Sequence, residues 1–210
     1  MTAKGEITRT KILDGAQGLI MKQGFAGTSI DDILSTSGVT KGAFFHQFKG
    51  KAQLARALVE RYAMTDLKLF EGFLNEVEAE SSDPLVQAIS FLRKFEAYIE
   101  GALDDDAPGC MYAVYTYESA QFDAEILNIV SDTLRKWTSI YVRKYQEVID
   151  AYPPAIDVTA RQLAELTVSI VEGGIILQRA HGDNGATNRQ SEQLRNYLHL
   201  LFGEPRAVAA

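Results

Sequence analysis

The sequence predicts an all-α fold of about nine helices. Three helices joined by short turns come first, and a larger helical segment follows them. Apolar residues recur at helical spacing along almost all of the 210 residues, and alternation of period two persists nowhere. Hydrophobic residues make up 46% of the chain, which is enough for a sizeable core. This composition excludes a mainly disordered chain, and the sequence contains no internal repeat.

The first three helices are marked by their caps and stop signals. One apolar stripe, which ends before Gly24, contains Ile12, Leu13, Ala16, Leu19 and Ile20. A second helix starts at Thr28 or Ser29, because Thr28 with Asp31, or Ser29 with Asp32, has the spacing of a capping box. Gly38 ends that helix within three turns, and Thr40 begins a third helix whose Phe44 and Phe48 face inward.

The remaining helices follow from periodicity and from breaks. We expect them at about 51–77, 85–103, 108–120, 124–149, 158–179 and 191–202. Pro108 suits a first helical turn, and Asp123 caps the long helix that follows it. We expect loops at the acidic stretch 78–83, the carboxylates 104–106, the Pro pair at 153–154 and the Gly/Asn-rich stretch 181–188. The tail from Gly203 is expected to fray.

Charge is unevenly distributed along the chain, whose net charge is −7. Residues 1–62 contain nine Lys and Arg against five Asp and Glu, a net of +4, and the rest carries −11. A basic segment joined to an acidic body is typical of local polyanion binding, although chance asymmetry explains the numbers equally well.

Several classes of protein and site are disfavoured by what the sequence lacks. A single Cys excludes a disulfide framework and a Cys-based zinc site, and three scattered His leave little for a metal cluster. The sequence shows no Gly-rich phosphate loop or nucleophile elbow, so we expect neither an enzyme nor a cofactor. Asp104–Asp106 before Pro108 reads as a solvated loop rather than a cation site. With no signal-peptide core and no apolar run of ~18 residues, we expect a soluble, cytoplasmic protein.

Residues 28–48 form a helix–turn–helix motif. Gly38 supplies the positive φ that ends one helix, Val39 fills the angle, and Thr40 caps the next. This spacing sets the second helix across the first, where its N-terminal side chains reach a major groove. Gly42 permits close backbone approach, and Lys51 begins the following helix, where it and free N–H groups hold a phosphate.

The segment Thr8–Tyr62 resembles the TetR-family transcriptional repressors. The matching residues are Ile12-Leu13, Gly24-Phe25, Thr28-Ser29-Ile30, Ile33, Gly38-Val39-Thr40-Lys41-Gly42, Phe44, His46-Gln47-Phe48, Lys51 and Leu54. The rest of the chain resembles the family in its all-helical character and length. The family has a phosphate-contacting Tyr where this chain has Phe45, so we expect Phe45 to pack against sugar or against the protein.

The resemblance implies a DNA-binding domain over residues 1–50 and a ligand-binding and dimerisation domain over 51–210. It implies a homodimer on a palindromic operator, with half-sites about 34–36 Å apart. The DNA-binding residues would be Thr28, Ser29, Thr40, Lys41, Gly42, Phe45, His46 and Lys51.

The last two helices are the expected dimer interface, because the resemblance implies a four-helix contact and the sequence offers two apolar seams. The first seam, with small residues for close approach, contains Leu163, Leu166, Ile170, Gly173, Gly174 and Leu177. The second contains Leu194, Leu198 and Leu201. The alternative is an ordinary buried pair of core helices.

Aromatic residues concentrate in the larger domain, where a small aromatic or lipophilic effector would bind. The candidate lining residues are Phe95, Tyr98, Cys110, Tyr112, Tyr115, Trp137 and Tyr141. The alternative is that most of them are core residues. Glu118 and Glu172 are weaker candidates for orienting a polar group, since a solvated helix face explains them equally well.

The functional prediction is a ligand-responsive, sequence-specific regulator that represses by occlusion, with activation left open. One alternative is a repressor that senses electrophiles through Cys110, which lies near a helix start that lowers a thiol pKa. Its rival is a small buried hydrophobe, and the Asp104–Asp106 run opposes thiol reactivity. A further alternative is a helical enzyme or binding protein that has lost DNA recognition.

Overall fold

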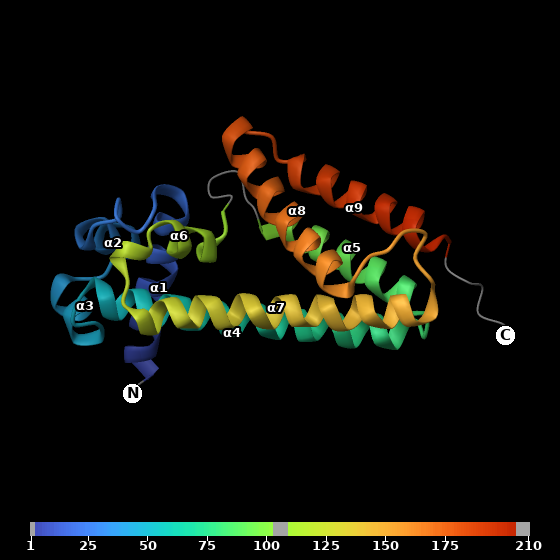
Figure 1. Ribbon diagram of the computed structural model, residues 1–210. Helices are drawn as coiled ribbons and strands as arrows, with labels where there is room; N and C mark the ends of the chain where they lie inside the picture. Colours follow the sequence, from blue (N-terminus) through green and yellow to red (C-terminus); the bar gives the residue numbers. More distant parts are fainter. Residues whose placement is uncertain (1–2, 103–108, 205–210) are drawn as a thin grey trace. The chain divides into compact units, whose positions relative to one another are not determined.

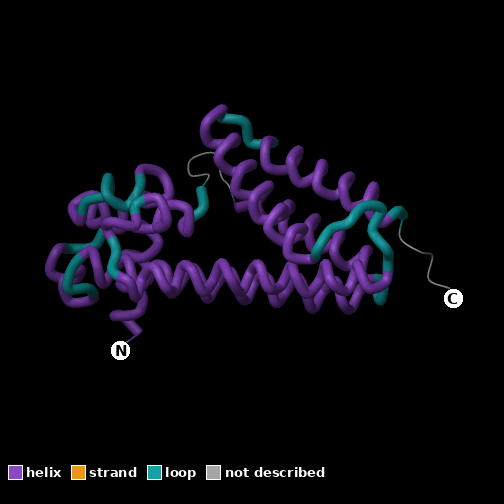
Figure 2. The backbone as a smooth tube through the Cα atoms, viewed as in Figure 1, coloured by secondary structure: helices purple, strands orange, loops and turns teal. Residues whose placement is uncertain are grey.

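The computed structural model describes residues 3–102 and 109–204, which form helices joined by turns and loops (Figures 1 and 2). The α-helices are α1 (Ala3–Gln23), α2 (Ile30–Ser37), α3 (Lys41–Gln47), α4 (Lys51–Glu80), α5 (Pro84–Ala102), α6 (Met111–Tyr117), α7 (Ala124–Ala151), α8 (Ala160–His181) and α9 (Ala186–Phe202). A 3-10 helix, η1, covers Ser119–Gln121. The predicted all-α fold is confirmed. The expected loop at 104–106 and the first-turn Pro108 lie outside the described residues.

The first three helices begin and end where their caps predict. Gly24 takes a φ of +81° directly after α1. Of the two possible capping boxes before α2, the structure contains Ser29 with Asp32. The Ser29 hydroxyl accepts from the Asp32 N–H at 3.1 Å, and the Asp32 carboxylate accepts from the Ser29 N–H at 2.9 Å. Thr40 caps α3 by accepting from the Ala43 N–H at 3.3 Å.

A small apolar core holds these three helices together, because α1 packs against both α2 and α3. Its fully buried side chains are Ile12, Ala16, Ile20, Ile33, Phe44 and Phe48. The guanidinium of Arg9 lies 4.5 Å above the Phe48 ring and extends this packing to the edge of the core. The third helix is too short to be stable alone, so this core fixes its position.

The chain divides into two compact units. One consists of Met1–Asp66 with Asp106–Thr133, and the other of Leu67–Asp105 with Leu134–Ala210. The first unit therefore combines the N-terminal helices with α6 and η1. The boundary at residue 50 between the DNA-binding and ligand-binding domains stays a prediction.

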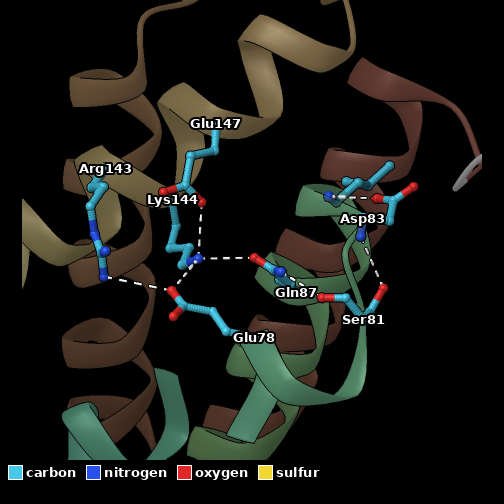
Figure 3. A network of polar contacts seen from close by, with 8 residues as sticks. Glu78, Ser81, Asp83, Gln87, Arg143, Lys144 and Glu147 are labelled. Atoms are coloured by element: carbon cyan, nitrogen blue, oxygen red, sulfur yellow. Dashed lines mark hydrogen bonds and ion pairs between the residues drawn. The ribbon is translucent and has the colours of Figure 1, made fainter. Parts of the chain in front are cut away.

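One helix boundary differs from the prediction at the end of α4, which continues through Glu78 to Glu80. Figure 3 shows the reason. The Lys144 ammonium, whose side chain is 5% exposed, donates to Glu78 at 2.7 Å, Glu147 at 2.9 Å and Gln87 at 2.9 Å. A buried cation from α7 thus neutralises the acidic end of α4, and the sequence around residue 78 does not reveal that cation.

A second difference lies at α9, which begins at Ala186 rather than at Ser191. Ala186 and Thr187 are 5% and 1% exposed, and the Thr187 hydroxyl bonds to the Gln178 side chain at 3.0 Å. Packing against α8 therefore overrides the loop-like Gly/Asn composition. A third difference is the early end of α6 at Tyr117, after which the chain tightens into η1.

Candidate nucleic-acid interface and effector region

The turn between α2 and α3 sets the direction of the second helix. Gly38 takes a φ of +65°, and a Cβ there would meet no atom within 4 Å, so only the backbone conformation requires glycine. The Ser37 hydroxyl donates to the Ile33 carbonyl at 2.7 Å and supports the end of α2. With Phe44 buried on the inner side, the opposite face of α3 is open to solvent.

That open face contains most of the predicted DNA-binding residues. Exposed side by side on and before α3 are Thr40, Lys41, Gly42, Phe45 and His46. The Phe45 ring is 45% exposed and meets the Phe44 ring edge-on, with centroids 5.3 Å apart. Its inner edge therefore packs on the protein while its outer edge stays exposed, and a contact with sugar stays a prediction.

Thr28 and Ser29 are engaged by the fold itself. Thr28 is 1% exposed, and its hydroxyl donates to the Gly24 carbonyl at 2.7 Å. Ser29 is exposed but uses its hydroxyl in the α2 capping box. The structure thus brings Ser29 to the surface at the start of α2 and leaves Thr28 beneath it.

Lys51, the predicted phosphate ligand, starts α4 and is half-buried. Its ammonium donates to the Phe25 carbonyl at 2.6 Å and lies 4.2 Å above the Phe25 ring. Partial desolvation lowers the pKa of Lys51, and the nearby Glu118 carboxylate acts in the opposite direction. The side chain therefore joins the start of α4 to the turn between α1 and α2.

Glu118, at the end of α6, holds the same turn and was not predicted in this role. Its two carboxylate oxygens accept from the backbone N–H groups of Phe25 at 3.1 Å and Ala26 at 2.6 Å. A Cβ on Gly24 would lie 2.4 Å from that carboxylate, so a side chain here would displace the carboxylate from its two N–H donors, and the φ of +81° separately favours glycine. Nothing in the sequence near Glu118 points to partners about ninety residues away.

An aromatic cluster lies under this carboxylate. The Phe25 ring packs against Phe122 and Tyr115, with centroids 4.7 Å and 6.2 Å away, and Tyr115 stacks on Phe122 at 4.2 Å. The Tyr115 hydroxyl donates to the Ala55 carbonyl at 2.8 Å. Burial raises the pKa of Tyr115, which keeps the hydroxyl a donor at neutral pH.

The predicted effector residues are divided between the two units, and their role stays a prediction. Phe95, Tyr98, Trp137 and Tyr141 lie in the second unit, where Trp137 stacks on Phe70 at 5.0 Å and Tyr141 meets Phe70 edge-on at 6.0 Å. Cys110, Tyr112 and Tyr115 are buried in the first unit. Cys110 is 7% exposed and is the N-cap residue of α6, without a side-chain capping bond.

Asp66, on α4, is a further residue of note that sequence reasoning missed. Its carboxylate is 6% exposed and accepts a hydrogen bond from the Tyr112 hydroxyl at 3.0 Å. Burial raises the pKa of Asp66 to about 7, and the Tyr112 bond partly opposes this rise. The helical position of Asp66 resembles that of any solvated acid on α4, so pattern alone gives no signal.

The predicted dimer residues divide between core and surface. Leu163, Gly174, Leu194, Leu198 and Leu201 are buried inside this chain, as in an ordinary pair of core helices. Leu166 and Leu177 are 36% and 41% exposed, and Ile170 and Gly173 are half-buried between them. Two apolar side chains that the prediction omitted, Ile176 on α8 and Leu200 on α9, are 50% and 78% exposed.

Residues 3–102 and 109–204 show neither a metal-binding cluster nor a membrane-spanning helix. They contain no group of three or more His, Cys, Asp or Glu side chains placed to hold a metal ion. No helix in these ranges is both long and apolar enough to cross a membrane.

Comparison with known protein families matches both parts of the chain. Residues 12–58 match the family described as bacterial regulatory proteins, tetR family. Residues 84–193 match the family described as transcriptional regulator LmrA/YxaF-like, C-terminal domain. The second match alone covers more than half of the 210 residues.

Individual relatives match over most of their length. The uncharacterized HTH-type transcriptional regulator YxaF of Bacillus subtilis (strain 168) is 28% identical. The match covers 92% of this chain and 96% of the length of YxaF. The HTH-type transcriptional regulator LmrA of the same strain is 25% identical over 81% of this chain and 85% of its own.

Solved structures share the fold across nearly the whole chain. A TetR transcriptional regulator from Chloroflexus aurantiacus J-10-FL has a TM-score of 0.79 at 25% identity, covering 98% of this chain and 100% of that one. A TetR-family regulator from Agrobacterium tumefaciens has a TM-score of 0.77 at 25% identity, over 91% and 97%. These matches are to transcriptional regulators and not to enzymes. The chain therefore belongs to the TetR family of bacterial regulatory proteins, as a helix–turn–helix transcriptional regulator with an LmrA/YxaF-like C-terminal domain.

Proposed function

We propose that this regulator is a cytoplasmic repressor that binds a palindromic operator as a homodimer and leaves it when a small aromatic or lipophilic ligand binds. The observation that carries the proposal is the exposed face of α3, with Lys41, Gly42 and His46 open to solvent above the buried Phe44. A helix held in this way can bring hydrogen-bond donors to the base edges of a major groove, and Gly42 lets its backbone approach the DNA closely.

The dimer part of the proposal is supported by an apolar surface on α8. We call Leu166, Ile170, Gly173, Ile176 and Leu177 the α8 stripe; each is exposed or half-buried. Exposed Leu and Ile side chains along one helix face favour burial against a second copy. In a two-fold dimer the same stripe meets its own copy, and Leu200 of α9 adds to the apolar area.

The effector part of the proposal is non-covalent. Cys110 is 7% exposed, which disfavours direct attack by a dissolved electrophile and so disfavours the thiol-sensing alternative. A ligand releases operator only to the extent that it binds the DNA-incompetent state more tightly, and this requires several kcal/mol for a near-complete shift.

The decisive experiment is binding of the purified protein to the DNA upstream of its own gene, across a salt series and with unrelated competitor DNA. Specific binding that survives competition and weakens linearly in log salt is the expected result. Weak binding that the competitor abolishes, followed by failure to enrich any sequence from a random pool, would overturn the proposal.

A further inference from the structure

A cleft lies between the first two turns of α1 and one side of α3. Its volume is about 220 Å³, and both helices belong to the first unit. Its lining residues are Lys4, Gly5 and Thr8 from α1, and Ala43, His46 and Gln47 from α3. None of these six residues is acidic, and two of them, Lys4 and His46, have basic side chains. The cleft is therefore suited to an anion.

Three side chains of the cleft offer hydrogen-bond donors to such an anion. Lys4 and His46 are exposed, and within residues 3–102 and 109–204 no acid forms an ion pair with either of them. The half-buried Gln47 adds an amide from the same side of α3 as His46. The Thr8 hydroxyl is already used, because it donates to the Lys4 carbonyl at 3.0 Å.

The cleft adjoins the face of α3 that the proposed function places against DNA. His46 belongs to both, since it is exposed beside Phe45 and also lines the cleft. A helix that enters a major groove has the sugar–phosphate backbone along its flanks, and phosphates are the anions that DNA presents there. The anion that reaches this cleft is therefore a backbone phosphate.

A phosphate in the cleft changes the protonation of His46. Without DNA, the Lys4 ammonium on the opposite wall disfavours a second positive charge, although the position of His46 in the last turn of α3 favours one. A phosphate between the two side chains replaces this repulsion by attraction to both. The protonated imidazole is then the stronger donor to a phosphate oxygen.

The other charged groups near His46 do not reverse this effect. α1 packs against α3, and its first turns also carry Glu6, which does not line the cleft, and Arg9, whose guanidinium lies over a buried ring. Lys41 begins α3 and Lys49 follows it, and both are exposed. These cations attract phosphate as well, so DNA binding and protonation of His46 favour each other.

We propose that this cleft, the α1–α3 cleft, receives a phosphate of the DNA backbone between Lys4 and His46, and that the imidazole of His46 takes up a proton from solvent as DNA binds. The phosphate oxygens accept from the Lys4 ammonium, the protonated imidazole and the Gln47 amide. The first turns of α1 thereby become part of the DNA interface. The inference rests on the proposed function in one respect, because DNA must lie along the exposed face of α3.

Proton uptake makes the affinity for DNA depend on pH. The bound state holds more protons than the free state, so affinity falls as pH rises. For one phosphate beside an exposed imidazole, we expect the affinity at pH 6 to exceed that at pH 8 by about three- to tenfold per subunit. His46→Gln should remove this difference.

Proton uptake is measured by titration calorimetry of the full-length protein with duplex DNA at pH 7, in two buffers of different ionisation enthalpy. The wild type should take up protons on binding, and His46→Gln should lose most of this uptake. His181→Gln, which removes an exposed histidine of α8, is the matched control and should keep the wild-type uptake. Both replaced side chains are exposed, so both variants should fold.

The phosphate itself is located with operator duplexes in which one backbone phosphate at a time is a neutral methylphosphonate. On unmodified DNA, Lys4→Met should weaken binding to all sequences alike and lower the slope of log affinity against log salt by about one. At one position per half-site, the methylphosphonate should remove both this effect and the proton uptake. Lys22→Met, at the other end of α1, is the control and should show no coupling to that phosphate.

Three results would overturn the inference: no proton uptake by the wild type, uptake that His46→Gln leaves unchanged, or no phosphate that couples to both Lys4 and His46. Specific operator binding without proton uptake refutes the cleft and leaves the repressor intact. If no operator is found, a random-sequence duplex takes its place in the calorimetry, because backbone contacts do not depend on sequence. Proton uptake with that duplex alone supports the cleft and refutes the repressor.

Discussion

At the scale of single residues, the two carboxylates of Glu118 and Asp66 differ in what surrounds them. Glu118 is half-buried and accepts from the Phe25 and Ala26 N–H groups, with the Lys51 ammonium nearby. Asp66 is buried and faces a phenol alone among its bonded partners. The first carboxylate holds backbone in place, while the second has no cation among its bonded partners and keeps its proton up to about pH 7.

Replacing Glu118 by Ala should loosen the turn that precedes α2. The Phe25 and Ala26 N–H groups then lose their acceptor, which costs about 1–3 kcal/mol in the free energy of unfolding. Urea unfolding at fixed protein concentration measures the change. Gln121→Ala, three residues further along η1 and exposed, should stay within about 0.5 kcal/mol. Equal stability of both variants would show that the carboxylate contributes nothing.

Replacing Asp66 by Asn should stabilise the fold in a pH-dependent way. Burial raises the pKa of Asp66 to about 7 in the folded state from its ordinary value of 3.8, which applies to the unfolded chain. Both states are therefore protonated below about pH 4, and the variant has no advantage there. Between pH 4 and 7 only the unfolded chain ionises, and wild-type stability falls by about 1.4 kcal/mol per pH unit relative to the variant. Above pH 7 the difference is constant. Thermal unfolding at pH 4, 5.5 and 8 would reveal it, and a pH-independent difference would contradict it.

Lys41 and Lys51 should affect DNA binding in different ways. Lys51→Met keeps an aliphatic stem over the Phe25 ring and removes the charge. The affinity for all DNA sequences should therefore fall alike, and the slope of log affinity against log salt should fall by about one. Lys41→Ala should change the preferred operator, at about 1–3 kcal/mol per lost base contact. Binding to a panel of operator variants distinguishes the two, and the reverse assignment would show that α3 docks differently.

At the scale of elements, the α8–α9 pair depends on one close approach. A Cβ on Gly174 would lie 2.8 Å from the Cα atom of Thr187, and backbone cannot yield easily. Its neighbour Gly173 has no atom within 4 Å of the same position. The two adjacent glycines of α8 therefore differ in what they allow.

Gly174→Ala should destabilise the protein by about 1–3 kcal/mol, because overpacking at Thr187 exceeds the gain in helix propensity. Gly173→Ala is the matched control and should stabilise the single chain by up to about 1 kcal/mol. Chemical unfolding at low protein concentration compares them. If both variants gained stability, the close α8–α9 contact would not exist in solution.

At the scale of the whole molecule, Leu177→Glu should separate the proposed dimer. A carboxylate in the α8 stripe loses its hydration when a second copy docks, which costs several kcal/mol. Sedimentation equilibrium should show a monomer at concentrations where the wild type is dimeric, and operator affinity should fall with it. Lys136→Glu, exposed on α7, should remain a dimer. A monomeric wild type would refute the dimer itself.

The sequence was most informative where local chemistry decides the structure. Capping residues, glycines and apolar spacing predicted the first three helices and the exposed face of α3, because each signal acts within a few residues. It failed where distant partners decide. Lys144 extends α4 past Glu78, Thr187 extends α9, and Glu118 reaches the turn at Phe25. Burial of Asp66 likewise depends on α6, so the residue pattern along α4 could not predict it.

The Glu118 contact also sets an order of events during synthesis. The helix–turn–helix segment leaves the ribosome first, but the carboxylate that holds its leading turn is 92 residues behind Ala26. At about 5–20 residues per second, this delay is roughly 5–20 seconds. During that interval the nascent chain contains the α3 sequence but lacks the Glu118 carboxylate, the Tyr115–Phe122 stack and the rest of the first unit. A fragment cut at residue 50 never gains that acceptor, and in the full chain the turn at Phe25 gains it only once Glu118 has been made.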